Sequence, residues 1–160
     1  MVINQEYFTV ELASKITLGF SLSEIGTVAQ FETKSICAVP GVADFWYGVA
    51  NFKGSLLWIL DSDRFFNLHQ KHQKLPQKLT VVVVKNKLSS SNKQVAVAVQ
   101  QLKGITAVSP SNFKLLSNKI SPRLRQCCST AAMVDEQIIN IIDSEALLRQ
   151  LSQESMLVST

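Results

Sequence analysis

The sequence predicts an all-β protein made of two similar small barrels, and two observations support this prediction. First, apolar β-branched runs of strand length dominate the chain, the clearest being residues 79–84 (LTVVVV) and 95–99 (VAVAV), whereas helical patterns are few. Second, residues 55–66 (SLLWILDSDRFF) repeat as residues 137–148 (QIINIIDSEALL), about half a chain length later. A five-stranded barrel closes its own sheet edges, so a duplicated unit of short strands predicts two such barrels within one domain, residues 1–160.

The N-terminal part of the chain is predicted to hold one strand and one short helical segment. Residues 7–13 (YFTVELA) begin with β-forming side chains and predict a strand. Ser21 and Glu24 have the spacing of a capping box, in which each side chain bonds a free backbone N–H at the start of a helix. Because Ile25 and Val28 follow, this spacing predicts a short helical segment there.

Glycines, polar loops and one amphipathic pattern predict the remaining elements. Residues 48–54 (GVANFKG) and 55–60 (SLLWIL) predict two strands joined at a glycine kink. Residues 85–94, which contain the run LSSSN, predict a flexible hairpin loop between the two clearest strands. Residues 143–153 predict an amphipathic helix that its first residue, an aspartate, can cap. We expect the tail, residues 155–160, to fray.

Composition excludes several classes of protein. With 46% hydrophobic and 18% charged residues, the chain is neither disordered nor a coiled coil. No apolar run approaches the roughly 18 residues of a membrane span, and the N-terminus lacks the pattern of a signal peptide. Two of the three cysteines, Cys127 and Cys128, are adjacent and therefore badly placed to bridge each other. Free thiols and a soluble, cytoplasmic protein are the resulting expectation.

Charge is distributed unevenly along the chain. No acidic residue lies between Asp63 and Asp135, while residues 64–134 carry twelve lysines and arginines. This asymmetry suggests an acidic protein surface, an anionic lipid or a nucleic acid as partner. Scattered lysines that keep the region soluble would explain the same count, so both explanations stay open.

No pattern of catalytic or metal-binding residues stands out. Asp61 and Asp143 follow the two copies of the repeated strand, a position typical of helix N-caps. His69 and His72 lie in a polar segment without the further ligands that a metal site needs. No phosphate-binding loop, dinucleotide fingerprint or nucleophile motif is present. The sequence therefore offers no candidate for a catalytic centre, and we expect neither a cofactor nor a metal.

The most distinctive local feature is the stretch between Gly48 and Gly54. Two glycines this close predict positive φ or a close approach by another chain. Three consecutive aromatic residues, 45–47 (FWY), come just before, and they cannot all face one core if they form a strand. An exposed aromatic is typical of a protein interface, whereas burial between the two barrels is the alternative, and both stay open.

Residues 40–68 (PGVADFWYGVANFKGSLLWILDSDRFFNL) resemble the core signature of the chemotaxis coupling protein family CheW. In that family an aromatic-containing lead runs into glycine, an apolar pair, Asn-x-Arg-Gly and then an apolar strand that ends in Asp. Further segments match in the right order, so the similarity spans residues 7–151. It implies a CheW-like fold, in which two small, five-stranded, SH3-like β-barrels are intertwined and a few short helices are added. The positions that match the signature directly are Gly48, Asn51, Gly54 and Asp61.

The chain departs from the family pattern at the positions of a family ion pair. Lys53 stands where the family has arginine, and Thr27 stands where it has glutamate. Lysine lacks the planar two-pronged donor set of arginine, so this pair is lost, and we expect Lys53 to be exposed. The family's acidic residue after the central hairpin falls at Gln100 or Gln101. These departures suggest a divergent member that serves a pilus-motility or another chemotaxis-like system.

The resemblance implies a non-enzymatic adaptor that couples methyl-accepting chemoreceptors to a CheA-type histidine kinase in chemotaxis or type IV pilus motility. Its partners would be the regulatory domain of the kinase and the cytoplasmic tip of a receptor, held in a groove between the barrels. The protein would then lie in receptor arrays at the inner face of the membrane. Ile25 and Val28 are the groove candidates, with plain core packing as the alternative. The candidate partner-binding residues are Ile25, Val28, Gly48, Val49, Asn51, Lys53 and Gly54.

Two other classes of protein remain as alternatives. A basic nucleic-acid-binding barrel is suggested by the acid-free stretch, and it would need aromatic side chains among the basic ones for base stacking. Only Phe65, Phe66 and Phe113 lie there, and the first two are expected to face the core. An enzyme that uses a strand-end carboxylate would need a second catalytic group, for which the sequence offers no candidate.

Overall fold

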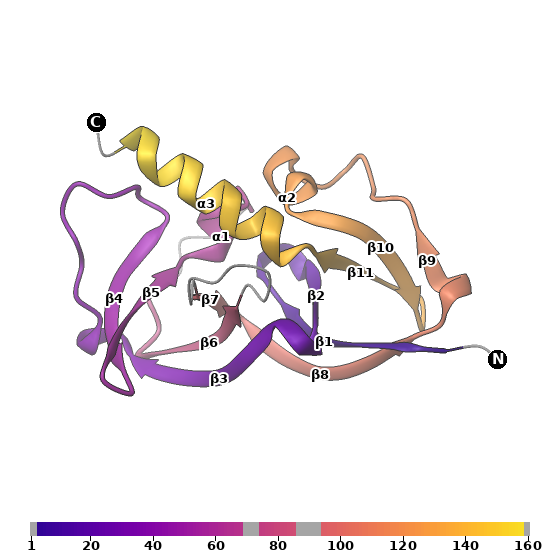
Figure 1. Ribbon diagram of the computed structural model, residues 1–160, viewed down its shortest axis with the longest axis horizontal. Helices are drawn as coiled ribbons and strands as arrows, with labels where there is room; N and C mark the ends of the chain where they lie inside the picture. The colour runs from indigo at the N-terminus through magenta and orange to yellow at the C-terminus, as the bar shows by residue number, and fades with distance from the viewer. Residues whose placement is uncertain (1–2, 69–73, 86–93, 159–160) are drawn as a thin grey trace.

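Two sheets lie side by side along the long axis of the molecule (Figure 1). The structure, a computed structural model, describes residues 3–68, 74–85 and 94–158. The six-stranded sheet has the order β8-β1-β2-β11-β10-β9, and the five-stranded sheet has the order β3-β6-β7-β5-β4. The elements are β1 (Gln5–Glu11), β2 (Thr17–Ser21), β3 (Ile25–Glu32), β4 (Trp46–Phe52), β5 (Ser55–Leu60), α1 (Ser62–Phe65), β6 (Lys78–Lys85), β7 (Gln94–Val99), β8 (Gln101–Val108), β9 (Phe113–Lys114), α2 (Pro122–Gln126), β10 (Cys128–Val134), β11 (Gln137–Ile142) and α3 (Ser144–Val158).

In the order of the chain, the strands of the five-stranded sheet are inserted between those of the six-stranded sheet. The five-stranded sheet uses strands β3 to β7, which are consecutive in the chain, while the other sheet joins β1 and β2 to β8–β11. The chain therefore crosses between the sheets twice, from β2 into β3 and from β7 into β8. This arrangement confirms the prediction of an all-β, CheW-like fold with two barrels and few helices. The two-residue strand β9 adds a sixth strand to one of them.

The repeat found in the sequence has the same local structure in both copies. Each copy is a strand followed by a helix whose first N–H groups bond an aspartate. The Asp61 carboxylate accepts a hydrogen bond from the N–H of Arg64 at 3.2 Å. The Asp143 carboxylate accepts one from the N–H of Ala146, also at 3.2 Å. The prediction that both aspartates are helix N-caps is confirmed.

The prediction of a helical segment around Ile25 is wrong, except for one helical turn just before this residue. Residues Leu22–Glu24 form one turn of 3₁₀ helix, and Ser21 makes no capping hydrogen bond. Ile25 and Val28 lie instead in strand β3, which pairs with β6 from Ile25 opposite Val84 onward. Pairing with the long β-branched strand β6 outweighs the weak local preference of a capping-box spacing.

The other predicted elements lie close to their expected positions. The first predicted strand is β1, and β4 and β5 form a hairpin around the expected kink. Strands β6 and β7 pair in antiparallel fashion, while residues 86–93 of their connection lie outside the described residues. Helix α3 extends to Val158, and the fraying of residues 155–160 remains a prediction. No helix in the described part of the chain is long and apolar enough to cross a membrane.

The largest hydrophobic core takes side chains from both sheets. Its fully buried side chains include Val10 and Phe20 from the six-stranded sheet and Val82 and Val97 from the five-stranded sheet. Helix α3, drawn in yellow along the top of Figure 1, closes this core with the apolar face that the sequence predicted. Each sheet also has a smaller buried cluster of its own, around Val81 in the five-stranded sheet and around Ile139 in the six-stranded sheet. The core side chains that α3 contributes are Leu147, Leu148 and Leu151.

Candidate protein-binding surface

Gly48 allows a second segment of the chain to lie against strand β4. Its φ is +138°, and a Cβ atom added there would lie 2.1 Å from the carbonyl oxygen of Cys37. Val49 and Cys37 exchange both backbone hydrogen bonds, at 2.8 and 2.9 Å. The predicted positive φ is therefore confirmed, whereas the close approach is made by a segment of the same chain and not by another chain. Gly48 is buried, so any role of it in partner binding would be to shape the strand.

The connection between β4 and β5 is a tight two-residue turn. Phe52 pairs with Ser55, and both residues between them have positive φ, 52° at Lys53 and 83° at Gly54. Positive φ at both positions is what a type I′ hairpin turn requires. The Asn51 side chain accepts a hydrogen bond from the N–H of Gly54 at 3.1 Å, which holds the turn in shape. This asparagine therefore acts first on its own hairpin.

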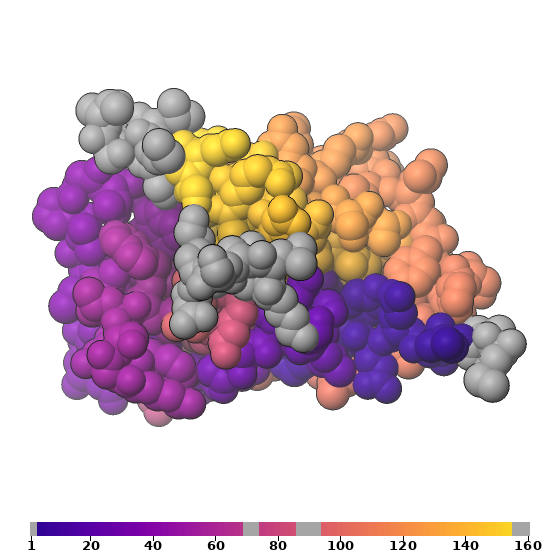
Figure 2. Space-filling view, in the orientation of Figure 1, coloured from indigo at the N-terminus to yellow at the C-terminus, as the bar shows by residue number. Residues whose placement is uncertain are grey.

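The outer end of this hairpin presents one exposed apolar side chain beside a positive charge. Leu56 is 71% exposed and stands opposite the exposed Asn51 in the register of the two strands. Lys53 is exposed, as expected, and its ammonium group lies 5.2 Å from the ring centre of Phe52. We call the surface formed by Val49, Asn51, Lys53, Gly54 and Leu56 the hairpin end. Figure 2 shows this part of the chain, in purple and magenta, at the left end of the molecule.

The candidates predicted from the sequence do not include Leu56, because it lies in the apolar run SLLWIL. Such a run suggests that all of its side chains are buried. In the structure only the start of the run alternates, since Leu57 is buried and Leu56 points to solvent. The signal that would have found it is the two-residue period of a strand counted from the turn.

The structure separates the two groove candidates, Ile25 and Val28. Ile25 is half-buried and packs against the main core, which favours the packing alternative for this residue. Val28 is 37% exposed on the same strand. Two more exposed apolar side chains lie on β8, the other strand that follows a crossing between the sheets, namely Leu102 (37%) and Ile105 (62%). β3 and β8 are the outer strands of their sheets, so these exposed apolar side chains lie at sheet edges.

The three consecutive aromatic residues contribute to the interior. Phe45 is buried and packs edge-on against Phe65 with ring centres 4.8 Å apart. Trp46 and Tyr47 are half-buried, and Trp46 contacts Trp58 with ring centres 5.4 Å apart. The alternative of burial is therefore closer to the structure than that of an exposed aromatic. The hairpin end uses an aliphatic side chain instead.

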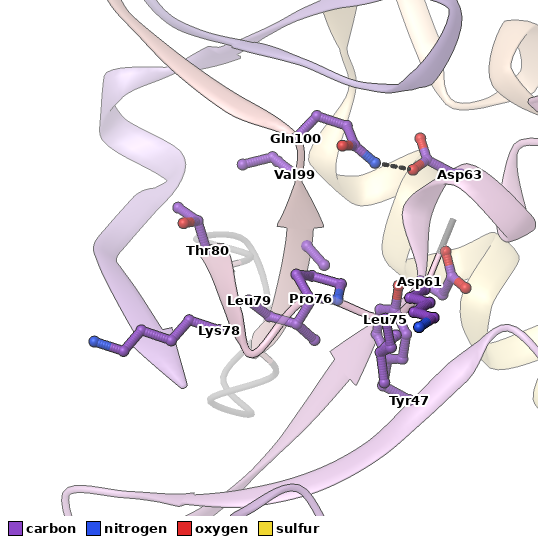
Figure 3. Close-up of a pocket in the computed structure, with 12 residues that line it drawn as sticks. Tyr47, Asp61, Asp63, Leu75, Pro76, Lys78, Leu79, Thr80, Val99 and Gln100 are labelled. Carbon is purple, nitrogen blue, oxygen red and sulfur yellow. Dashed lines mark hydrogen bonds between the residues drawn. The ribbon is translucent and has the colours of Figure 1, made fainter. Parts of the chain in front are cut away.

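A small cleft of about 220 Å³ lies beside helix α1 (Figure 3). Tyr47, Asp61, Asp63 and Gln100 contribute polar groups to it. Burial raises the pKa of the Asp61 carboxyl, and burial together with the neighbouring Asp61 charge raises the pKa of the Tyr47 hydroxyl. Asp61 is occupied as the cap of α1, so it is not a free catalytic group.

The structure also bears on possible metal ligands and on the reactivity of the cysteine thiols. No group of three or more His, Cys, Asp and Glu side chains suited to a metal ion exists among the described residues. His69 and His72 lie outside those residues. Burial raises the pKa values of the Cys127 and Cys128 thiols to about 12, so neither is a ready nucleophile. Both cysteines, and Cys37, are free thiols, as expected.

The fold pairs several basic residues of the acid-free stretch with acidic residues from outside it. Lys103 lies 3.4 Å from Glu11, and Arg123 lies 3.3 Å from Glu154. The aromatic residues of this stretch offer no stacking surface, because Phe65 and Phe66 are fully buried, as expected. Phe113 is half-buried against Tyr7. These observations favour the explanation of a solvated, partly paired set of charges over a nucleic-acid site.

Substitution of Lys53 by alanine is expected to change the free energy of unfolding by no more than about 0.5 kcal/mol. The side chain is exposed, and alanine keeps the same Cβ at the positive φ, so backbone strain does not change. Thermal unfolding of the two proteins checks this. A variant that melts far below the wild type would show that the lysine is structural and would remove it from the hairpin end.

The chain forms two related β-barrels that share a core. Apolar side chains are exposed at one hairpin and along β3 and β8. These features define a domain suited to binding other proteins. The chain belongs to the CheW-like domain family, whose sequence profile matches residues 6–152. In its fold the chain is similar to the crystal structure of the scaffolding protein TtCheW from Thermoanaerobacter tengcongensis. The two superpose with a TM-score of 0.72 at 15% sequence identity, over 88% of this chain and 90% of that chain. No curated protein matches the sequence.

Proposed function

We propose that this chain is a non-enzymatic adaptor that couples methyl-accepting chemoreceptors to a CheA-type histidine kinase, in chemotaxis or in type IV pilus motility. Membership of the CheW-like family supports this role, as does the similarity in fold to a scaffolding protein. The adaptor would work in the cytoplasm, within receptor arrays at the inner face of the membrane. The observation that carries the proposal is the exposed hairpin end on this fold.

The kinase regulatory domain is proposed to dock at the hairpin end. The type I′ turn and the Asn51–Gly54 hydrogen bond hold this surface in one conformation before binding, which lowers the entropy cost of association. Leu56 supplies an apolar anchor, and Lys53 supplies a charge that steers an acidic partner. Gly48 shapes the strand behind the hairpin end, and Val49 binds the Cys37 segment through its backbone.

The receptor tip is proposed to bind along β3 and β8, the two strands that follow the passages of the chain from one sheet to the other. Val28 on β3 and Leu102 and Ile105 on β8 present exposed apolar side chains, to which a helical hairpin could add its apolar face. This surface takes residues from both sheets, whereas the hairpin end takes residues from one sheet only. Strands β3 and β8 both run along the lower edge of the view in Figure 1.

Replacement of Leu56 by aspartate is expected to weaken binding of a CheA-type regulatory domain by roughly tenfold or more, because it puts an unpaired charge in the apolar contact. The wild-type affinity should be on the order of micromolar, as for other small signalling contacts. Isothermal titration calorimetry with the purified kinase domain measures both values. Since Leu56 is 71% exposed, the variant should keep the thermal stability of the wild type.

The control is the same substitution at Leu115, which is 90% exposed and lies on the other sheet's connection to α2. Leu115→Asp should bind like the wild type. Equal losses in both variants, or no heat from the wild type well above micromolar concentration, would count against docking at the hairpin end. A strong shift of random RNA by the wild type at physiological salt would favour the nucleic-acid alternative.

A further inference from the structure

Asp63 is a buried carboxylate that holds parts of both sheets. It lies in α1, is only 6% exposed, and uses both oxygens as acceptors. One accepts a hydrogen bond from the backbone N–H of Ala13 at 2.8 Å. The other accepts one from the side-chain amide of Gln100 at 2.8 Å, the dashed line in Figure 3. Asp61, two residues earlier, caps α1, whereas the Asp63 side chain makes this link.

The two groups that Asp63 holds lie where the sheets meet. Ala13 is in the connection between β1 and β2, in the six-stranded sheet. Gln100 stands between β7 and β8, where the chain leaves the five-stranded sheet, and its own N–H bonds the carbonyl oxygen of Glu11 at 2.9 Å. One carboxylate thus connects α1 of one sheet to a loop of the other sheet and to a crossing between them.

The loop held by Asp63 is in a backbone conformation that needs support. Ser14 and Lys15, directly after Ala13, have φ values of 59° and 57°. Consecutive left-handed residues other than glycine each cost on the order of 1 kcal/mol, so they persist only where surrounding contacts hold them. The Asp63–Ala13 hydrogen bond is one of those contacts.

A corresponding contact fixes the first crossing. The Ser144 hydroxyl, at the start of α3, bonds the carboxylate of Glu24, just before β3. Ser144 occupies the place in its repeat that Ser62 occupies beside Asp63 in the other repeat. Each crossing between the sheets is therefore tied to the helix that follows one copy of the repeated strand.

We propose that Asp63 and Gln100 form a latch that fixes the orientation of β8 relative to the five-stranded sheet and thereby shapes the receptor surface. Asp63 is a positioning residue in this role, since it touches neither proposed partner surface. The functional part rests on the proposed function, because that surface combines β3 and β8. The hairpin end lies within a single sheet and does not depend on the latch.

The latch is tested with Gln100→Glu, which replaces the amide donor by a carboxylate that repels Asp63. The amide protons of residues 13 and 100 should exchange about tenfold faster than in the wild type, as expected for loss of a buried charged hydrogen bond. The double variant Asp63→Asn/Gln100→Glu should return to within about twofold, because the new amide can donate to the new carboxylate. Gln101→Glu, the same change one position along, is the control and should exchange like the wild type. Unchanged exchange in Gln100→Glu would overturn the latch.

Binding then tests what the latch does. With a recombinant receptor cytoplasmic hairpin as probe, Gln100→Glu should bind at least about fivefold more weakly and the double variant should recover, while kinase-domain affinity stays within about twofold. Faster exchange with unchanged receptor binding would overturn the role in shaping that surface. If the wild type binds neither partner, the proposed function fails, whereas the exchange comparison still decides the latch.

Discussion

Gly48→Ala is expected to lower the free energy of unfolding by about 3 kcal/mol or more, or to prevent folding of the five-stranded sheet. An alanine Cβ at this position would lie 2.1 Å from the Cys37 carbonyl oxygen and 2.7 Å from its carbonyl carbon. Backbone atoms cannot swing aside as the end of a flexible side chain can, so the segment around Cys37 must leave strand β4. Both hydrogen bonds between Cys37 and Val49 are then lost. Chemical denaturation monitored by tryptophan fluorescence measures the change, because Trp46 and Trp58 lie in this sheet.

Gly54→Ala is the matched control, because it separates backbone strain from steric overlap. Gly54 has φ +83°, yet an added Cβ would meet nothing within 4 Å. Only the cost of a left-handed alanine remains, on the order of 1 kcal/mol. Equal losses of stability in the two variants would show that strain alone, and not the approach of the Cys37 segment, explains Gly48.

Phe65→Ala is expected to destabilise the protein by about 4 kcal/mol, in the range found for buried aromatic side chains. Phe65 is fully buried between the sheets and packs against Phe45 and Phe66, with ring centres 4.8 and 5.2 Å away. Arg123 lies over its ring at 4.9 Å and donates a hydrogen bond to its carbonyl oxygen at 3.1 Å. The truncation therefore removes contacts on which both sheets depend.

Both sheets should unfold together in this variant, in one transition at a lower temperature. Differential scanning calorimetry checks this, and two separate transitions would contradict a shared core. Phe31→Ala serves as control, because Phe31 is only half-buried and packs against Phe52 and the smaller buried cluster of the five-stranded sheet. The loss there should be less than half as large.

These predictions assign different tasks to residues that the sequence placed in one group and to Leu56, which the structure adds to them. Gly48 supports the strand, Asn51 and Gly54 shape the turn, and Lys53 and Leu56 are the side chains left for a partner. Whether these residues bind the kinase is what the calorimetric comparison of Leu56→Asp and Leu115→Asp decides. A substitution of Gly48 should lower the stability of the protein. A substitution of Lys53 or Leu56 should weaken binding and leave stability unchanged.

The local sequence pattern alone was sufficient to predict the structure of the repeat. The matched order of apolar strand, Asp and Ser in residues 55–66 and 137–148 predicted two strand-to-helix units, and both aspartates cap. The same 82-residue offset relates the turn at Lys53–Gly54 to the one at Asp135–Glu136, where φ is also positive at both residues. The caps depend on neighbours within a few residues, and their chemistry is visible in the sequence, whereas the turn at Asp135–Glu136 was not predicted.

The sequence by itself determined the all-β class, the duplication, the caps and the need for glycine near residue 48. Only the tertiary structure decided that β3 is a strand, that Ile25 packs against the core while Leu56 is exposed, and that Asp63 links Ala13 to Gln100. Each of these depends on which distant segment lies alongside. Residues 13, 63 and 100 are brought together by strand pairing across two sheets, and no periodicity within one segment encodes that pairing.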